Sequence, residues 1–194
     1  MKMAEQENYL EGKTFEKGDL LKKGEYENCV FNGLDFYEKD LSEYKFTDCK
    51  FNNCNLSLVK LNKTVIRDTG FNDCKIMGVR FDSCNEFGLS FSFEGCILNH
   101  SSFYKLKIRK AIFKDTLLQE TDFAEADLTN TIFQNCNLAN AIFDRTILEK
   151  ADFRSSFDYS IDPEINQIKK AKFSISGVIG LLGKYDIDIE LGLS

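Results

Sequence analysis

A large apolar residue recurs at every fifth position through most of this 194-residue chain, and no other feature constrains the fold as much. The first run is Tyr26, Phe31, Phe36, Leu41, Phe46, Phe51, Leu56, Leu61, Ile66, Phe71, Ile76 and Phe81. After a slip of two residues the second run is Phe93, Leu98, Phe103, Ile108, Phe113, Leu118, Phe123, Leu128, Phe133, Leu138, Phe143, Leu148 and Phe153. A period of five fits neither the α-helix nor the β-strand. It is typical of a solenoid, whose short units bury apolar residues only against neighbouring units.

Small residues occupy a second regular position, two residues before each large centre. All seven cysteines lie in it: Cys29, Cys49, Cys54, Cys74, Cys84, Cys96 and Cys136. None of their spacings is the Cys-x-x-Cys of a zinc or redox site. We therefore predict that the thiols are buried as compact apolar side chains. His100 is the only histidine, and it lies in an outward position. Because the cysteines are assigned to the core and no second histidine is present, we predict no metal, no cofactor and no enzymatic activity.

The two inward positions together resemble the A(D/N)LXX signature of the pentapeptide-repeat family, most closely in Ala126-Asp127-Leu128-Thr129-Asn130. The resemblance covers residues 24–157. It implies an all-β solenoid, a right-handed quadrilateral β-helix in which each side is one repeat and each coil has four repeats. The large centre and its small partner would point inward, and the other three residues of each repeat would face solvent.

The repeat divides the chain into three parts. Residues 1–23 lack it and are predicted to form an N-terminal cap. Residues 24–157 form the β-helix, with a register slip at 84–92 that must bulge from one face. Residues 158–194 are predicted to form a small helix/strand capping module, in which Ser174 or Ser176 caps a short helix and residues 185–191 alternate as a strand does.

The chain has 31 acidic and 25 basic residues, a net charge of −6, which argues against direct nucleic-acid binding. It has no apolar run of the ~20 residues needed to span a membrane and no signal peptide. Its cysteine count is odd. We therefore predict a soluble, cytoplasmic protein.

Two groups within the family share further segments with this chain. Residues 25–31 and 161–166 resemble the microcin B immunity members, and residues 171–173, 181–182 and 187–189 are similar to the C-terminal module of the Qnr quinolone-resistance members. Both groups protect DNA gyrase and topoisomerase IV from poisons, and family members form rod-like dimers with a DNA-like surface. The longer projecting loops of the Qnr proteins have no counterpart here beyond the two-residue slip.

The resemblance implies a non-enzymatic DNA mimic that binds a bacterial type II topoisomerase and acts as a resistance or immunity factor. A run without Lys or Arg supplies the predicted acidic partner-binding residues: Asp115, Glu120, Asp122, Glu125, Asp127 and Asp144. The slip segment would add a shape-specific contact through Glu86, Phe87 and Leu89. The predicted homodimer interface is Val178, Ile179, Leu181, Leu182, Ile187 and Ile189. The alternative is a generic interaction scaffold with an unrelated protein partner.

Overall fold

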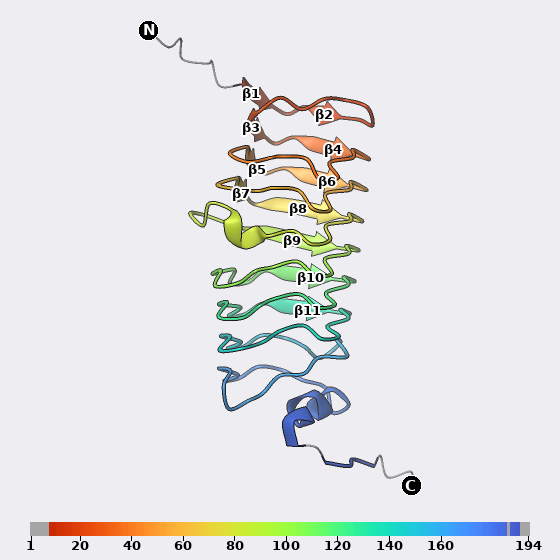
Figure 1. The fold of residues 1–194 in the computed structure, drawn as a ribbon, viewed down its shortest axis with the longest axis vertical. Coiled ribbons are helices and arrows are strands. Elements are labelled where there is room, and N and C mark those ends of the chain that lie inside the picture. Colours follow the sequence, from red (N-terminus) through yellow and green to blue (C-terminus); the bar gives the residue numbers. More distant parts are fainter. Residues whose placement is uncertain (1–7, 186, 191–194) are drawn as a thin grey trace.

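The chain folds into a long, narrow parallel β-solenoid, shown by a computed structural model that describes residues 8–185 and 187–190 (Figure 1). A four-stranded sheet contains β1 (Asn8–Glu11), β3 (Gly24–Glu27), β5 (Lys45–Thr47) and β7 (Val65–Arg67). A seven-stranded sheet contains β2 (Thr14–Phe15), β4 (Val30–Asn32), β6 (Lys50–Asn52), β8 (Thr69–Asn72), β9 (Phe91–Glu94), β10 (Ile112–Lys114) and β11 (Ile132–Gln134). The predicted all-β solenoid is confirmed.

Residues twenty apart in sequence lie side by side on successive coils. Phe113 pairs with Phe133 in the second sheet, and isolated bridges join Ile97 to Leu117 and Asp122 to Ile142. The rod therefore has four sides, which we name by their large centres. Side A carries Phe31, Phe51, Phe71, Phe93, Phe113, Phe133 and Phe153; side B carries Phe36, Leu56, Ile76, Leu98, Leu118 and Leu138. Side C carries Leu41, Leu61, Phe81, Phe103, Phe123 and Phe143; side D carries Tyr26, Phe46, Ile66, Ile108, Leu128 and Leu148.

Most sides end in a corner residue with a left-handed backbone, two positions after the centre. Lys110, Asp115, Glu125 and Asn130 have φ values of 62°, 50°, 57° and 60°. This conformation is unfavourable for non-glycine residues. It is maintained here because most corner N–H groups donate to the next coil, as the Glu125 N–H does to the Asp144 carbonyl at 2.8 Å.

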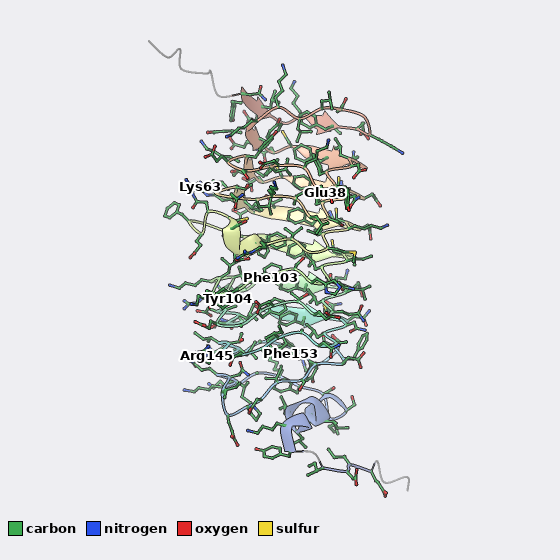
Figure 2. All side chains as sticks on the ribbon, in the orientation of Figure 1. Glu38, Lys63, Phe103, Tyr104, Arg145 and Phe153 are labelled. Atoms are coloured by element: carbon green, nitrogen blue, oxygen red, sulfur yellow. The ribbon has the colours of Figure 1, made fainter. Side chains whose placement is uncertain are left out.

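The core is a column of stacked aromatic rings. The rings of Phe113 and Phe133 on side A lie 5.1 Å apart and are 5° from parallel. Rings on adjacent sides meet edge to face, as Phe103 and Phe113 do at 5.8 Å and 85°. Figure 2 shows Phe103 and Phe153 within the outline of the coils and Tyr104 and Arg145 at its outer edge. Stacked and edge-to-face arrangements are the ones that aromatic quadrupoles favour.

The seven cysteines are all free and buried, as predicted. Burial raises the pKa of Cys49 and of Cys136 to about 11, and that of Cys84 to about 12. These thiols remain protonated at neutral pH, which makes them poor nucleophiles and metal ligands.

The segments at the two ends continue the solenoid. At the N-terminal end β1 pairs with β3 and β2 pairs with β4, so residues 8–15 extend both sheets. At the other end the coil register continues past residue 157. Bridges join Ile147 to Gln167 and Asp152 to Lys172, and the Phe153 and Phe173 rings stack at 5.4 Å.

The predicted C-terminal helix consists of two short 3₁₀ segments, η2 (Gly177–Leu181) and η3 (Gly183–Tyr185). The Ser174 hydroxyl accepts a hydrogen bond from the Gly177 N–H at 3.0 Å. No strand forms over residues 187–190, although the alternating pattern predicted one; Asp186 and Leu191 lie outside the described residues. The third 3₁₀ segment, η1 (Phe81–Ser83), precedes the register slip.

The ring column sets the stability of the rod. We expect Phe113→Ala to lower the free energy of unfolding by about 3–5 kcal/mol, because it leaves a cavity between fully buried neighbours. The adjacent Ile112→Ala, at a position 43% exposed, should cost less than about 1 kcal/mol. Urea denaturation followed by circular dichroism measures both, and equal costs would contradict a core role for the ring.

The C-terminal cap depends on two glycines. A Cβ at Gly177 would lie 2.0 Å from the Tyr159 hydroxyl, and a Cβ at Gly180 would lie 2.2 Å from the Tyr159 carbonyl oxygen. We expect Gly177→Ala and Gly180→Ala to detach η2 from the last coil, which limited proteolysis detects as faster cleavage near the C-terminus. Gly183→Ala, whose nearest contact is at 3.4 Å, is the matched control and should be cleaved at the wild-type rate.

Candidate protein-binding surface

The six predicted acidic residues lie on different sides of the rod. Asp115 is at the corner after side A and Glu120 at the corner after side B. Asp122 and Asp144 lie on side C, Glu125 at the corner after it, and Asp127 on side D. They do not form one acidic face, because twenty consecutive residues go once around the rod.

Lysine and arginine side chains form ion pairs with three of the six acids, Glu125, Asp127 and Asp144. Glu125 lies 3.4 Å from both Lys105 and Arg145 and accepts a hydrogen bond from the Tyr104 hydroxyl at 3.2 Å. Arg145 also lies 3.3 Å from Asp144. Lys105 and Arg145 are each twenty residues from Glu125 and lie outside residues 115–144, so a sequence window over that run does not include them. A comparison of residues i and i+20 would have found them.

Asp127 is the most buried of the six acids, at 4% exposure. The Arg109 guanidinium binds it through two nitrogens, at 2.7 and 2.6 Å, and Thr129 donates its hydroxyl at 2.6 Å. Burial acts to raise the pKa of this carboxyl, but the hydrogen bonds from Arg109 and Thr129 outweigh it and hold the pKa below the usual Asp value. Asp127 therefore has a structural partner within the rod.

The other acids have weaker attachments. Glu120 lies 3.2 Å from His100 on the preceding coil. Asp115 accepts a hydrogen bond from the Asn135 amide at 2.7 Å, and Asp122 accepts one from the Ala124 N–H at 2.8 Å. No basic side chain among the described residues forms an ion pair with Asp115 or Asp122. These two remain available to a partner.

The slip segment forms a loop that projects from side D. Strands β8 and β9 pair with an offset of 22 residues, and Arg80 bridges to Ser102 with the same offset, so the two extra residues are on the side between Phe81 and Phe93. Figure 1 shows this loop, in yellow-green, outside the outline of the other coils. Glu86 is exposed and Phe87 is 78% exposed, whereas Leu89 is half-buried against the core.

Side chains and backbone groups hold the loop in place. Asn85 N–H donates to the Thr64 carbonyl at 2.9 Å, and Ser90 N–H donates to the Ile66 carbonyl at 3.1 Å. The Arg67 guanidinium lies 5.4 Å from the centre of the Phe87 ring and donates to the Phe87 carbonyl at 3.4 Å. Phe87 is therefore presented on an anchored loop.

Phe91 explains how the loop bulges without opening the core. It occupies the position normally reserved for a small residue and is 7% exposed. Its ring contacts those of Phe81, Phe93 and Phe103 at 5.1–5.8 Å. Phe91 fills the space where side D would have supplied a large centre, so Glu86 can face solvent. The sequence signal was an aromatic residue in a small-residue position.

The six predicted interface residues at the C-terminus divide into three groups. Val178 and Ile179 are each 42% exposed on η2. Leu181 and Leu182 are half-buried, and Leu181 packs against the core. Ile187 and Ile189 follow η3 and are 55% and 42% exposed. The Tyr185 hydroxyl donates to Glu164 at 3.0 Å, which holds η3 against the last coil.

Neither a metal site nor a membrane-spanning helix is found among the described residues. No group of three or more His, Cys, Asp or Glu side chains there is arranged to hold a metal ion. No helix in that part of the chain is long and apolar enough to cross a membrane.

Comparison with known proteins identifies the repeat. Residues 89–158 match the family model described as Pentapeptide repeat region. A trypsin-treated form of QnrB1, a plasmid-mediated fluoroquinolone resistance protein, is similar in structure with a TM-score of 0.56 at 15% identity, covering 94% of this chain and 100% of that one. Full-length QnrB1 gives a TM-score of 0.50 at 15% identity over 93% and 100% of the two chains.

A third solved structure is more distant. HetL, a pentapeptide repeat protein involved in heterocyst differentiation regulation from the cyanobacterium Nostoc, gives a TM-score of 0.40 at 13% identity, over 88% and 86% of the chains. No curated protein sequence matches the chain significantly.

The Asp127–Arg109 pair makes stability depend on pH. We expect Asp127→Asn to lower the free energy of unfolding by about 1 kcal/mol at pH 7, because a charged acceptor is lost beside an exposed guanidinium. Since the folded-state pKa of Asp127 is depressed, the advantage of the wild type is complete above the unfolded pKa of ~3.9. It declines as the pH falls through the folded-state pKa.

Denaturant unfolding of both proteins between pH 2 and 7 measures this difference. Asp122→Asn, which removes a carboxylate without an ion pair among the described residues, is the matched control and should change stability by less than about 0.5 kcal/mol. A cost of Asp127→Asn that stays constant down to pH 2 would contradict the assignment.

Proposed function

Because the chain is a pentapeptide-repeat protein, we propose that it binds a bacterial type II topoisomerase, DNA gyrase or topoisomerase IV, and protects it from a poison that traps cleaved DNA. The proposed role is that of a non-enzymatic resistance or immunity factor. Its basis is a likeness in fold to a fluoroquinolone resistance protein over nearly the whole of both chains, together with one local feature of this rod.

That feature is the exposed, anchored phenylalanine of the slip loop. Large aromatic side chains that are already ordered contribute disproportionately to protein interfaces, because little conformational entropy is lost on binding. Phe87 is 78% exposed, and Arg67 and Asn85 hold it in place. We infer that Phe87 is the main contact with the topoisomerase and that Glu86 flanks it.

DNA mimicry is the finer part of the proposal, and two residues support it. Asp115 and Asp122 are acids without an ion pair among the described residues, on the coil that follows the slip loop. B-form DNA carries one charge per ~1.7 Å of axis. Two acids are too few to reproduce the charge of a duplex. We therefore infer that they steer the basic surface of the enzyme toward the loop.

Dimerisation through the C-terminal module remains a further proposal. Val178 and Ile179 form the exposed apolar surface on η2, with Ile175, which is 95% exposed, beside them. A second copy meeting this surface would produce an end-to-end rod, as the family resemblance implies.

A general interaction scaffold with an unrelated partner is the alternative. A scaffold would use the same rod and the same exposed loop, but it would have no effect on a topoisomerase. One assay therefore separates the two functions.

A supercoiling assay with purified DNA gyrase and ciprofloxacin tests the proposal. We expect the wild-type protein to restore supercoiling in the presence of the drug, and Phe87→Ala to lose most of this rescue, because the anchor of the interface is removed. Ile142→Ala, which truncates a 49% exposed residue on side C, is the matched control and should retain rescue.

Two results would contradict the proposal. If the wild type neither rescues supercoiling nor inhibits it at higher concentration, with ciprofloxacin or with a microcin-type poison, topoisomerase binding is wrong. If Phe87→Ala rescues as well as the wild type, the loop assignment is wrong, and Asp115→Lys combined with Asp122→Lys then tests the acidic residues alone.

A further inference from the structure

The slip loop leaves an unpaired β-edge on side D, within the wall of the rod. On later coils of this side a backbone N–H donates to the preceding coil: Asp127 to Leu106, Ile147 to Ala126 and Gln167 to Thr146, at 2.8–3.0 Å. The equivalent N–H of Lys107 has no backbone partner among the described residues. The carbonyls of Lys107 and Arg109 also have none, whereas the equivalent carbonyls of Asp127 and Thr129 accept from Ile108 and Lys110.

The cause is the path of the inserted residues. The two ends of the loop are bonded to the preceding coil, at the Thr64 and Ile66 carbonyls. The residues between them bulge outward instead of running beneath residues 107–109. One rung of the wall is therefore missing. The Lys107 N–H and the Lys107 and Arg109 carbonyls lack backbone partners among the described residues, as on the edge strand of a sheet, whereas the Ile108 N–H between them is bonded to the Asp127 carbonyl.

A cavity adjoins this edge. Its volume is about 360 Å³, and its lower wall includes Leu89, Ser90 and Phe91. Its upper wall includes Arg109 and Lys110. It is open to solvent, and both apolar side chains (Leu89, Phe91) and polar ones (Ser90, Ser92) line it. Of the edge residues, Ile108 and Arg109 line the cavity, whereas Lys107 does not. The edge and the cavity are the two elements that strand addition requires: main-chain hydrogen bonds for affinity and a pocket for alternate side chains.

The charges beside the edge favour an acidic occupant. Lys107 and Lys110 are exposed and form no ion pair among the described residues, whereas Arg109 between them is bound to Asp127. The nearest acid in the cavity wall, Asp68, is hydrogen-bonded to Ser90, which donates to it at 3.0 Å. Glu86 is on the loop and does not line the cavity.

We propose that the edge at residues 107–109 binds an extended, carboxylate-rich peptide segment of a protein partner, which adds as the missing strand. Its backbone pairs with Lys107 and Arg109, and its acidic side chains lie against Lys107 and Lys110. Edge lysines can also serve to prevent strand pairing, and the experiment separates that role from binding. The proposal does not depend on the identity of the partner protein.

Amide hydrogen exchange of the full chain tests the edge first. In the free protein the Lys107 N–H should exchange at least ~100-fold faster than those of Asp127, Ile147 and Gln167, its bonded equivalents on side D. Exchange of Lys107 at the same rate as Asp127 would overturn the proposal, because the edge would already be paired.

Peptide binding tests the occupant. The probe is an octapeptide of alternating Glu and Val, and an octapeptide of alternating Lys and Val is the control for charge. The acidic peptide at saturation should slow exchange of Lys107 at least ~10-fold while leaving Asp127 unchanged. Absence of this protection, or equal protection by the basic peptide, would overturn the proposal; the former would assign the lysines to preventing strand pairing.

Matched charge reversals locate the site. Lys107→Glu combined with Lys110→Glu should abolish binding of the acidic peptide. Lys150→Glu combined with Lys170→Glu makes the same change in net charge further along side D and should preserve binding. Thermal unfolding of each variant verifies folding, and equal binding by both double variants would show that only the net charge matters.

Discussion

Vertical pairing at an interval of twenty residues is the constraint on which the rest of the structure depends. Every inward side chain meets a copy of its own position one coil away, as Phe113 meets Phe93 and Phe133. Like rings stack well on like rings, and away from the slip most backbone groups of each side find partners on the neighbouring coil. A single side of five residues could bury none of this surface alone, so the coils are stable only as a stack.

The same pairing decides what the outer surface carries. Sequence order runs around the rod, whereas physical proximity runs along it, so a run of acids in sequence becomes a ring of separated acids in space. Lys105, Arg109 and Arg145 reach that ring from neighbouring coils and bind Glu125 and Asp127. On side D, in contrast, Lys107 and Lys110 form no ion pair with any residue that the structure describes. The charge at a point on a solenoid therefore depends on residues stacked along the rod and not on those adjacent in sequence.

How much could be predicted from the sequence follows from the same distinction. The five-residue period was enough for the solenoid, the buried cysteines and the location of the slip, because each depends only on which positions point inward. The partners of Asp127 and the use of Phe91 to fill a missing centre depend on how neighbouring coils compensate for one another. The C-terminal cap was least predictable: residues 177–185 form 3₁₀ turns because they fit around Tyr159, and no periodicity encodes that fit.

The missing rung has a mechanical consequence. In a rod of this kind the interstrand hydrogen bonds run parallel to the long axis, so on each side these bonds resist stretching of the rod. At the slip the row on side D is interrupted, while on side A β8 and β9 remain paired across it. Bending that opens side D therefore meets less resistance than bending in any other direction. Among the described coils, we therefore expect the rod to bend most easily at the slip, in the plane that opens side D.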